Sequence, residues 1–137
     1  MSLDYEAIRA KRNATNAFAR KLGLTITRLE EGYAEAVMAF SPTDLNPYGS
    51  AHGGCLFSAA DVACGAAISS YGRDAATLNS SFNYLRPGLN TKLIRAKAHV
   101  VKHGKRVSVA EVSVMDENDQ VLCTGVFTFM TISTNTL

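Results

Sequence analysis

Hydrophobic and polar positions along the chain predict six β-strands. The clearest covers residues 106–114, in which apolar and polar residues alternate. Because successive side chains of a strand point to opposite faces, this alternation predicts one buried face and one polar face. The predicted strands, separated by turn-forming residues, span residues 24–29, 33–40, 77–84, 92–101, 106–115 and 121–132.

Two further segments have the pattern of helices. In the first, apolar residues such as Ile8, Phe18 and Leu22 recur near helical spacing, and Gly23 is a suitable stop. The second, residues 55–70, is rich in alanine and apolar on nearly every side, which predicts a buried helix. Asp61 lies in the middle of this helix, where a carboxylate is costly unless it is paired, hydrogen-bonded or facing a cleft.

The order of these elements predicts an α+β fold in a single domain, residues 1–137, with residues 1–23 as an N-terminal helix. A long sheet can bury one apolar helix only by curving around it. The short turns favour an antiparallel meander. The strands outnumber what one helix can cover, so we expect the sheet to pair with a second copy of the chain.

Composition narrows the possible functions. The 137 residues are 47% hydrophobic and carry a net charge of +2, so we expect a packed core and no nucleic-acid partner. The three cysteines form no CxxC pair and are expected to be small buried hydrophobes, and the three histidines have no metal-ligand spacing. No signal peptide or membrane span is recognisable, so we expect a cytoplasmic protein without a membrane partner.

One run resembles a known family. Residues 46–61 read NPYGSAHGGCLFSAAD, with an Asn, a Gly, a His-Gly-Gly triplet and an acid nine residues after the His. FNYLRP at residues 82–87 and HGKR at residues 103–106 follow in the same order. From about residue 24 to residue 132, the chain is similar to the hotdog-fold acyl-CoA thioesterases of the phenylacetate-pathway (PaaI-type) group. The resemblance implies the hotdog fold and thioester hydrolysis without a separate cofactor, coenzyme A being part of the substrate.

Physical chemistry assigns parts of this run to the reaction. Thioester hydrolysis needs an activated water or a nucleophile, and a donor for the oxyanion. The backbone N–H of Gly53, at a helix start and next to Gly54, is suited to be that donor because no Cβ blocks the approach. Asp61 is the candidate base or nucleophile, and the sequence does not separate these two roles. The two residues are about 12 Å apart along a helix, so a composite site between two subunits is expected.

The resemblance implies the remaining roles. Asn46 and His52 act with Gly53 on one side of a dimer-interface site, and Asp61 acts with Thr77 on the other. Coenzyme A lies near Lys105 and Arg106. The acyl group is expected in an apolar tunnel between subunits, lined by Leu56, Phe57 and Phe82, with Gly54 letting the acyl carbonyl approach the backbone. We expect a homodimer that pairs into a homotetramer, although the sequence does not decide between dimer and tetramer.

Each residue also has a purely structural interpretation. Asn46 precedes a proline and suits a turn, His52 suits a helix cap, and Thr77 suits an ordinary strand position. Asp61 suits a salt bridge with an arginine such as Arg73 or Arg86. Two other functions stay open: a hotdog hydratase or dehydratase acting on acyl thioesters, and a non-catalytic acyl-CoA binding module. The acyl group, aryl, phenylacetyl or medium-chain, is not determined.

Overall fold

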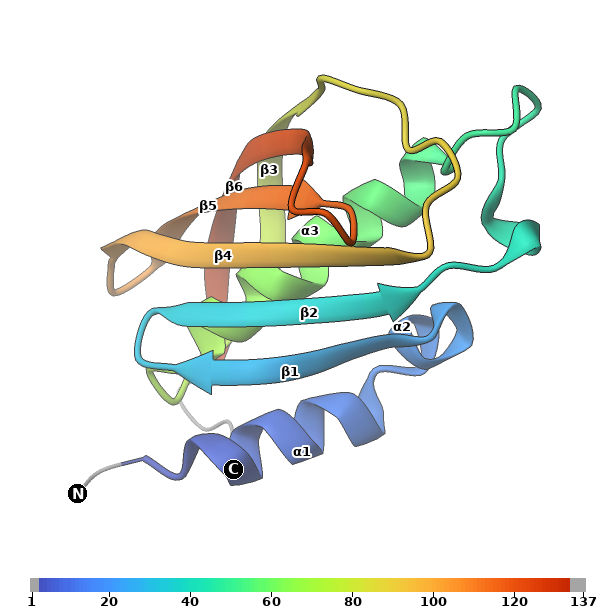
Figure 1. Cartoon of the computed structure of the whole chain (residues 1–137). Coiled ribbons are helices and arrows are strands. Elements are labelled where there is room, and N and C mark those ends of the chain that lie inside the picture. Colours follow the sequence, from blue (N-terminus) through green and yellow to red (C-terminus); the bar gives the residue numbers. More distant parts are fainter. Residues whose placement is uncertain (1–2, 134–137) are drawn as a thin grey trace.

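A computed structural model describes residues 3–133 of the protein as one curved sheet wrapped around a long helix (Figure 1). The strands form a six-stranded sheet in which all neighbours are antiparallel. The elements are α1 (Tyr5–Thr15), α2 (Ala17–Leu22), β1 (Leu24–Glu30), β2 (Tyr33–Ala39), the 3-10 turn η1 (Pro42–Asp44), α3 (Gly53–Ser69), β3 (Asp74–Tyr84), β4 (Leu93–His103), β5 (Val107–Met115) and β6 (Val121–Ser133). The α+β class and the single apolar helix expected from the sequence are confirmed.

The N-terminal segment differs from the single helix that was predicted. Asn16 leaves the helical conformation at φ −86° and ψ 89°, which ends α1 and starts α2. Its side-chain oxygen accepts a hydrogen bond of 3.0 Å from the N–H of Ala19, as an N-cap does. The predicted stop at Gly23 is correct, with a left-handed φ of 75° at the end of α2.

The sheet order β1-β2-β4-β5-β6-β3 corrects the predicted meander. Strands β4, β5 and β6 follow one another as expected, but β3 lies at the edge beyond β6. Helix α3 causes the difference. It follows β2 and precedes β3 in the sequence, and it crosses the concave face of the sheet, so the chain enters β3 at the edge opposite β1 (Figure 1). Strand β3 therefore lies beside the helix whose acid the sequence singled out.

Strand β5 also differs in detail from its predicted pattern. Its buried residues are Ser108, Ala110, Val112, Val114 and the terminal Met115, whereas Val107 and Val109 point to the half-exposed outer face. The expected polar outer face is confirmed only in the second half of the strand. The position of the strand in the sheet, and not the polarity of its residues alone, determines which side chains face the helix.

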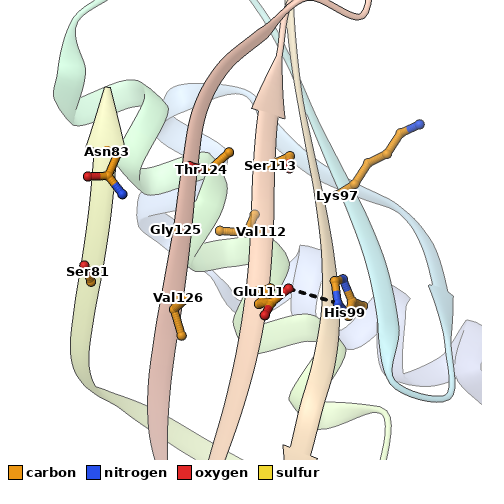
Figure 2. Close-up of a pocket in the computed structure, with 10 residues that line it drawn as sticks. All are labelled: Ser81, Asn83, Lys97, His99, Glu111, Val112, Ser113, Thr124, Gly125 and Val126. Atoms are coloured by element: carbon orange, nitrogen blue, oxygen red, sulfur yellow. Dashed lines mark ion pairs between the residues drawn. The ribbon is translucent and has the colours of Figure 1, made fainter. Parts of the chain in front are cut away.

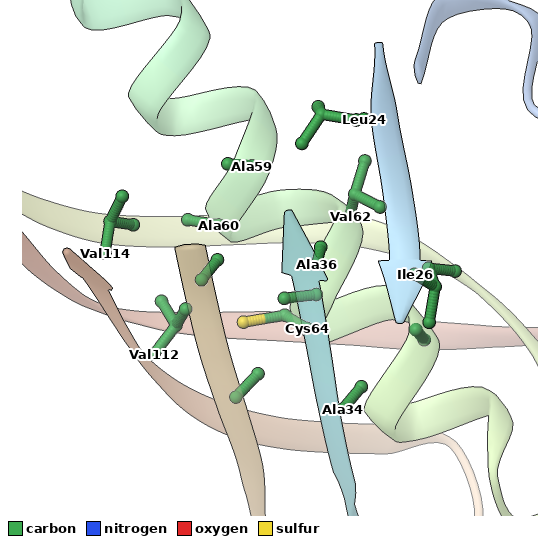
Figure 3. Packing of buried hydrophobic residues seen from close by; sticks show 14 of the residues in the cluster. Leu24, Ile26, Ala34, Ala36, Ala59, Ala60, Val62, Cys64, Val112 and Val114 are labelled. Atoms are coloured by element: carbon green, nitrogen blue, oxygen red, sulfur yellow. The ribbon is translucent and has the colours of Figure 1, made fainter. Parts of the chain in front are cut away.

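Small side chains fill the interface between α3 and the sheet (Figure 3). Alanines of the helix, such as Ala60 and Ala63, and alanines of the strands, such as Ala36 and Ala96, are all inaccessible to solvent. Short side chains on both surfaces let helix and sheet approach closely at native packing density.

The cysteines behave as predicted. Cys55, Cys64 and Cys123 are free and buried, and burial raises the pKa of the Cys123 thiol to about 12. None of the helices within residues 3–133 is long and apolar enough to cross a membrane.

Candidate active site

The loop before α3 is organised by Asn46. Its Oδ1 accepts hydrogen bonds from the backbone N–H of Tyr48 at 2.9 Å and of Ser50 at 3.0 Å, and its Nδ2 donates to Ser50 Oγ at 2.7 Å. The backbone N–H of His52 then donates to Asp44 O at 2.8 Å. Asn46 thus shapes the loop that leads the chain into α3, and it faces the cleft described below.

His52 caps α3 and selects one backbone donor. Its Nδ1 accepts a hydrogen bond of 2.8 Å from the N–H of Gly54, so the ring carries its proton on Nε2 when neutral. The backbone carbonyl of His52 accepts hydrogen bonds from the backbone N–H of Cys55 at 3.0 Å and of Leu56 at 3.3 Å. The backbone N–H of Gly53 lies in the same first turn. It has no hydrogen-bond acceptor within residues 3–133. Hydrogen bonds to the His52 carbonyl polarise the same peptide unit and favour donation by the Gly53 N–H.

Tyr84 at the end of β3 packs on this turn. Its hydroxyl donates a hydrogen bond of 2.9 Å to the carbonyl of Gly53. A Cβ placed on Gly53 would lie 3.2 Å from the Tyr84 ring, so the glycine allows the close contact. Sequence reasoning missed this role, because nothing local links a strand tyrosine to a helix start.

A cleft of about 500 Å³ opens beside the Gly53 amide. One wall is formed by Asn46, Gly53, Gly54 and Leu56, and the other by residues 84–88. Of the predicted acyl contacts, Leu56 and Gly54 therefore line the cleft. Phe57 and Phe82 instead pack edge to face at a centroid distance of 5.3 Å and lie against the core.

Asp61 lies further along α3 and faces β3. It is half-buried, and the Thr77 hydroxyl donates a hydrogen bond of 2.5 Å to its Oδ1. The structure thus brings together the two residues that the resemblance paired. A salt bridge with Arg73 or Arg86 does not form within the described chain: Arg73 Nη1 donates to the carbonyl of Lys105 instead, at 3.3 Å.

The predicted site residues fall into two groups in one chain. Gly53 and Asp61 are about 12 Å apart along the axis of α3. Lys105 and Arg106 are exposed in the turn between β4 and β5, near the far end of α3. The ring of Tyr71, just after α3, confirms this placement by stacking on His103 with centroids 3.9 Å apart. At a separation of about 12 Å, the Gly53 N–H and the Asp61 carboxylate cannot both meet one carbonyl within one subunit.

A second hollow lies on the outer face of the sheet (Figure 2). It measures about 280 Å³ and contains an ion pair between His99 and Glu111 at 3.4 Å, with both side chains half exposed. None of the predicted site residues lines it. In residues 3–133 no group of three or more His, Cys, Asp or Glu side chains is placed to hold a metal ion.

Comparison with known proteins gives one consistent result. The model of the "Thioesterase superfamily" matches residues 48–123. The chain is 33% identical over 107 residues to "Acyl-coenzyme A thioesterase PaaI" of Escherichia coli, covering 78% of this chain and 76% of that protein.

Solved structures agree with the sequence comparison. The E. coli PaaI protein from the phenylacetic acid degradation operon superposes with a TM-score of 0.84 at 30% identity, covering 91% of this chain and 94% of that one. A Streptococcus mutans protein solved with acetyl-CoA superposes with a TM-score of 0.77 at 29% identity, covering 82% and 90%. The six-stranded curved sheet around α3 is the hotdog fold.

Proposed function

Because this chain belongs to the thioesterase superfamily and is a thioester hydrolase, we propose that it cleaves acyl-coenzyme A thioesters to a free acid and coenzyme A. The observation that carries the proposal is the Asp61 carboxylate, set in an otherwise apolar helix and hydrogen-bonded by Thr77 at 2.5 Å. Two relatives support the choice of thioester: one is named an acyl-coenzyme A thioesterase, and another was solved with acetyl-CoA.

The reaction needs Asp61 as an anion. In one route Asp61 removes a proton from water while the water oxygen attacks the thioester carbon, the C–S bond breaks, and the coenzyme A sulfur leaves and takes up a proton. In the other route an Asp61 oxygen attacks the carbon itself, the C–S bond breaks, and the coenzyme A sulfur leaves and takes up a proton. Water then hydrolyses the resulting anhydride to the free acid and the Asp61 carboxylate. Thr77 donates to one oxygen of the carboxylate in either route, which orients the other oxygen towards the substrate.

The Gly53 amide is the oxyanion donor in this proposal. It points from the start of α3, where the helix dipole adds partial positive charge, and its N–H has no other acceptor in the described structure. One such donor typically contributes about 2.7–4 kcal/mol at the transition state. His52 keeps the Gly54 amide occupied and the turn in shape, and Asn46 holds the loop in front of it.

Two subunits complete the site. Gly53 of one subunit faces Asp61 of the other, since about 12 Å of helix separates them within a chain. The acyl group then occupies the cleft next to Leu56 and Tyr84, which has room for an aromatic or a medium-length group. Lys105 and Arg106 face the phosphates of coenzyme A, Lys105 with a compact ammonium charge and Arg106 with a planar guanidinium that pairs with two phosphate oxygens. We expect a homodimer, pairing into a tetramer, which light scattering tests.

A thiol-release assay over aromatic and aliphatic acyl-CoAs tests the proposal. We expect turnover by the parent and a loss of at least about 100-fold for Asp61→Asn, because removal of a general base alone typically costs that much. Glu111→Gln is the matched control, as it neutralises a carboxylate on the opposite face of the sheet and should retain parental turnover. Parental rates for Asp61→Asn, or hydration of an enoyl-CoA in place of thiol release, would overturn the proposal.

A further inference from the structure

Arg12 of α1 reaches across to α3 and lies on its surface at Gly65. A Cβ placed on Gly65 would stand only 3.1 Å from Arg12 Nη2, so this position of α3 has room for the guanidinium because it lacks a side chain. Arg12 is half-buried as a residue, and its Nε is enclosed without a hydrogen-bond partner among the described residues. An unsatisfied buried donor is uncommon in folded proteins and calls for an explanation.

Gly65 lies one helical turn after Asp61, on the same face of α3. Side-chain positions four residues apart on a helix are about 5–6 Å from each other at Cβ. The Arg12 guanidinium, which lies against Gly65, is therefore close to the Asp61 carboxylate. Within residues 3–133 no carboxylate lies within 4.0 Å of Arg12, so its charge acts on Asp61 through space and makes no direct contact with either carboxylate oxygen, of which Oδ1 accepts from Thr77.

The electrostatics agree with this geometry. Burial lowers the pKa of the Arg12 guanidinium, and the charges of Asp74 and Asp61 oppose that decrease. Arginine nevertheless stays protonated at any working pH. Arg12 thus faces two carboxylates, one at the start of β3 and one in the candidate active site.

We propose that Arg12 is a positioning residue of the active site: its fixed positive charge, held against α3 at Gly65, stabilises the Asp61 anion. This inference rests on the proposed function and deepens it. Both routes open to Asp61 need the anion, so the role of Arg12 is the same in either. An anion in an apolar helix is expensive, and a nearby buried cation offsets that cost without occupying the oxygen that reacts.

A purely structural role for Arg12 makes a different prediction. If Arg12 only balanced Asp74, its removal would change stability and leave the pH dependence of turnover as it is. The groups that face Asp61 are few in the described structure: Arg12 from α1, the Thr77 hydroxyl from β3, and the Cys64 thiol on α3 itself. Asp74 faces Arg12 and competes for its charge.

The test is the pH profile of kcat for the parent, Arg12→Met, Arg12→Lys and Asp74→Asn. For Arg12→Met we expect the midpoint of the acidic limb to move up by roughly one pH unit, with KM little changed, as for the loss of a unit charge about one helical turn, roughly 6 Å, away. At a fixed pH on the acidic limb, this shift lowers the rate about tenfold. Arg12→Lys should restore the limb, and Asp74→Asn should move it slightly down because a competing negative charge is gone.

A second measurement separates this inference from the proposed function. Denaturant unfolding of the parent, Arg12→Met, Asp61→Asn and the double variant gives the coupling of the two side chains without any turnover. A measurable coupling with no activity on any acyl-CoA would sink the proposed function alone. An unmoved acidic limb in Arg12→Met, or no coupling, would overturn the role of Arg12. If Arg12→Met fails to fold, Arg12→Gln, which also removes the charge but keeps a polar side chain, must show the same shift.

Discussion

The Thr77 hydroxyl donates a 2.5 Å hydrogen bond to Asp61 Oδ1, joining an edge strand to the central helix. We predict that Thr77→Val lowers kcat roughly tenfold, because a hydrogen bond to a charged group is typically worth about 1.5–3 kcal/mol and this one is partly exposed. Thr77→Ser keeps the donor and should retain most of the parental kcat. Steady-state thiol release measures both, and a parental kcat in the valine variant would show that the bond is not used in turnover.

The Gly53 amide is tested by replacing it with a residue that has no N–H. Proline is well tolerated at the first position of a helix, so Gly53→Pro should fold. We expect kcat to fall by about 100- to 1,000-fold, the usual loss for one oxyanion donor.

Gly53→Ala is the control for that variant. It adds the same Cβ, which would meet the Tyr84 ring at 3.2 Å, but it keeps the N–H. If the alanine variant loses as much activity as the proline variant, crowding by Tyr84 and not the missing donor explains the loss.

Mixed dimers test the composite site. We expect Gly53→Pro and Asp61→Asn to be nearly inactive alone, and a co-refolded equal mixture to recover about a quarter of parental activity. Half of the randomly formed dimers are mixed, and each mixed dimer has one intact site if Gly53 and Asp61 come from different subunits. A site built within one chain would recover nothing, since every site would then carry one substitution.

The stack of Tyr71 and His103 predicts a pH dependence of stability. Burial, and to a smaller extent the charge of Arg73, lower the pKa of His103 below its ordinary value of 6.5. As the pH falls through 6.5, the unfolded chain therefore takes up a proton before the folded chain does, and stability decreases. Below the folded pKa the loss is complete.

Urea unfolding at about pH 7.5 and pH 5 measures this effect. We expect His103→Gln to lose less stability than the parent between the two pH values. The difference should be small, because His103 is exposed at the sheet end. An equal or larger loss in the variant would contradict the prediction.

Local patterns predicted a large part of the fold. The apolar run of α3, the strands and most turns follow from periodicity and turn residues, which report burial of one face. The break at Asn16 was not predicted, because asparagine tolerates both a helix interior and a cap, and only packing against β1 selects the cap. The place of β3 at the edge was not predicted either, since strand order depends on where the helix delivers the chain.

For the site, the sequence by itself determined the chemical groups: one acid in an apolar helix, and a His-Gly-Gly turn at the start of that helix. Only the tertiary structure decided which side chains support them. Thr77 meets Asp61 because β3 pairs with β6, Tyr84 meets Gly53 at the other end of the same strand, and Arg12 meets Gly65 because α1 packs near α3. The physical reason is that local periodicity encodes which residues are buried, whereas long-range neighbours depend on register and crossing geometry, which no single segment contains.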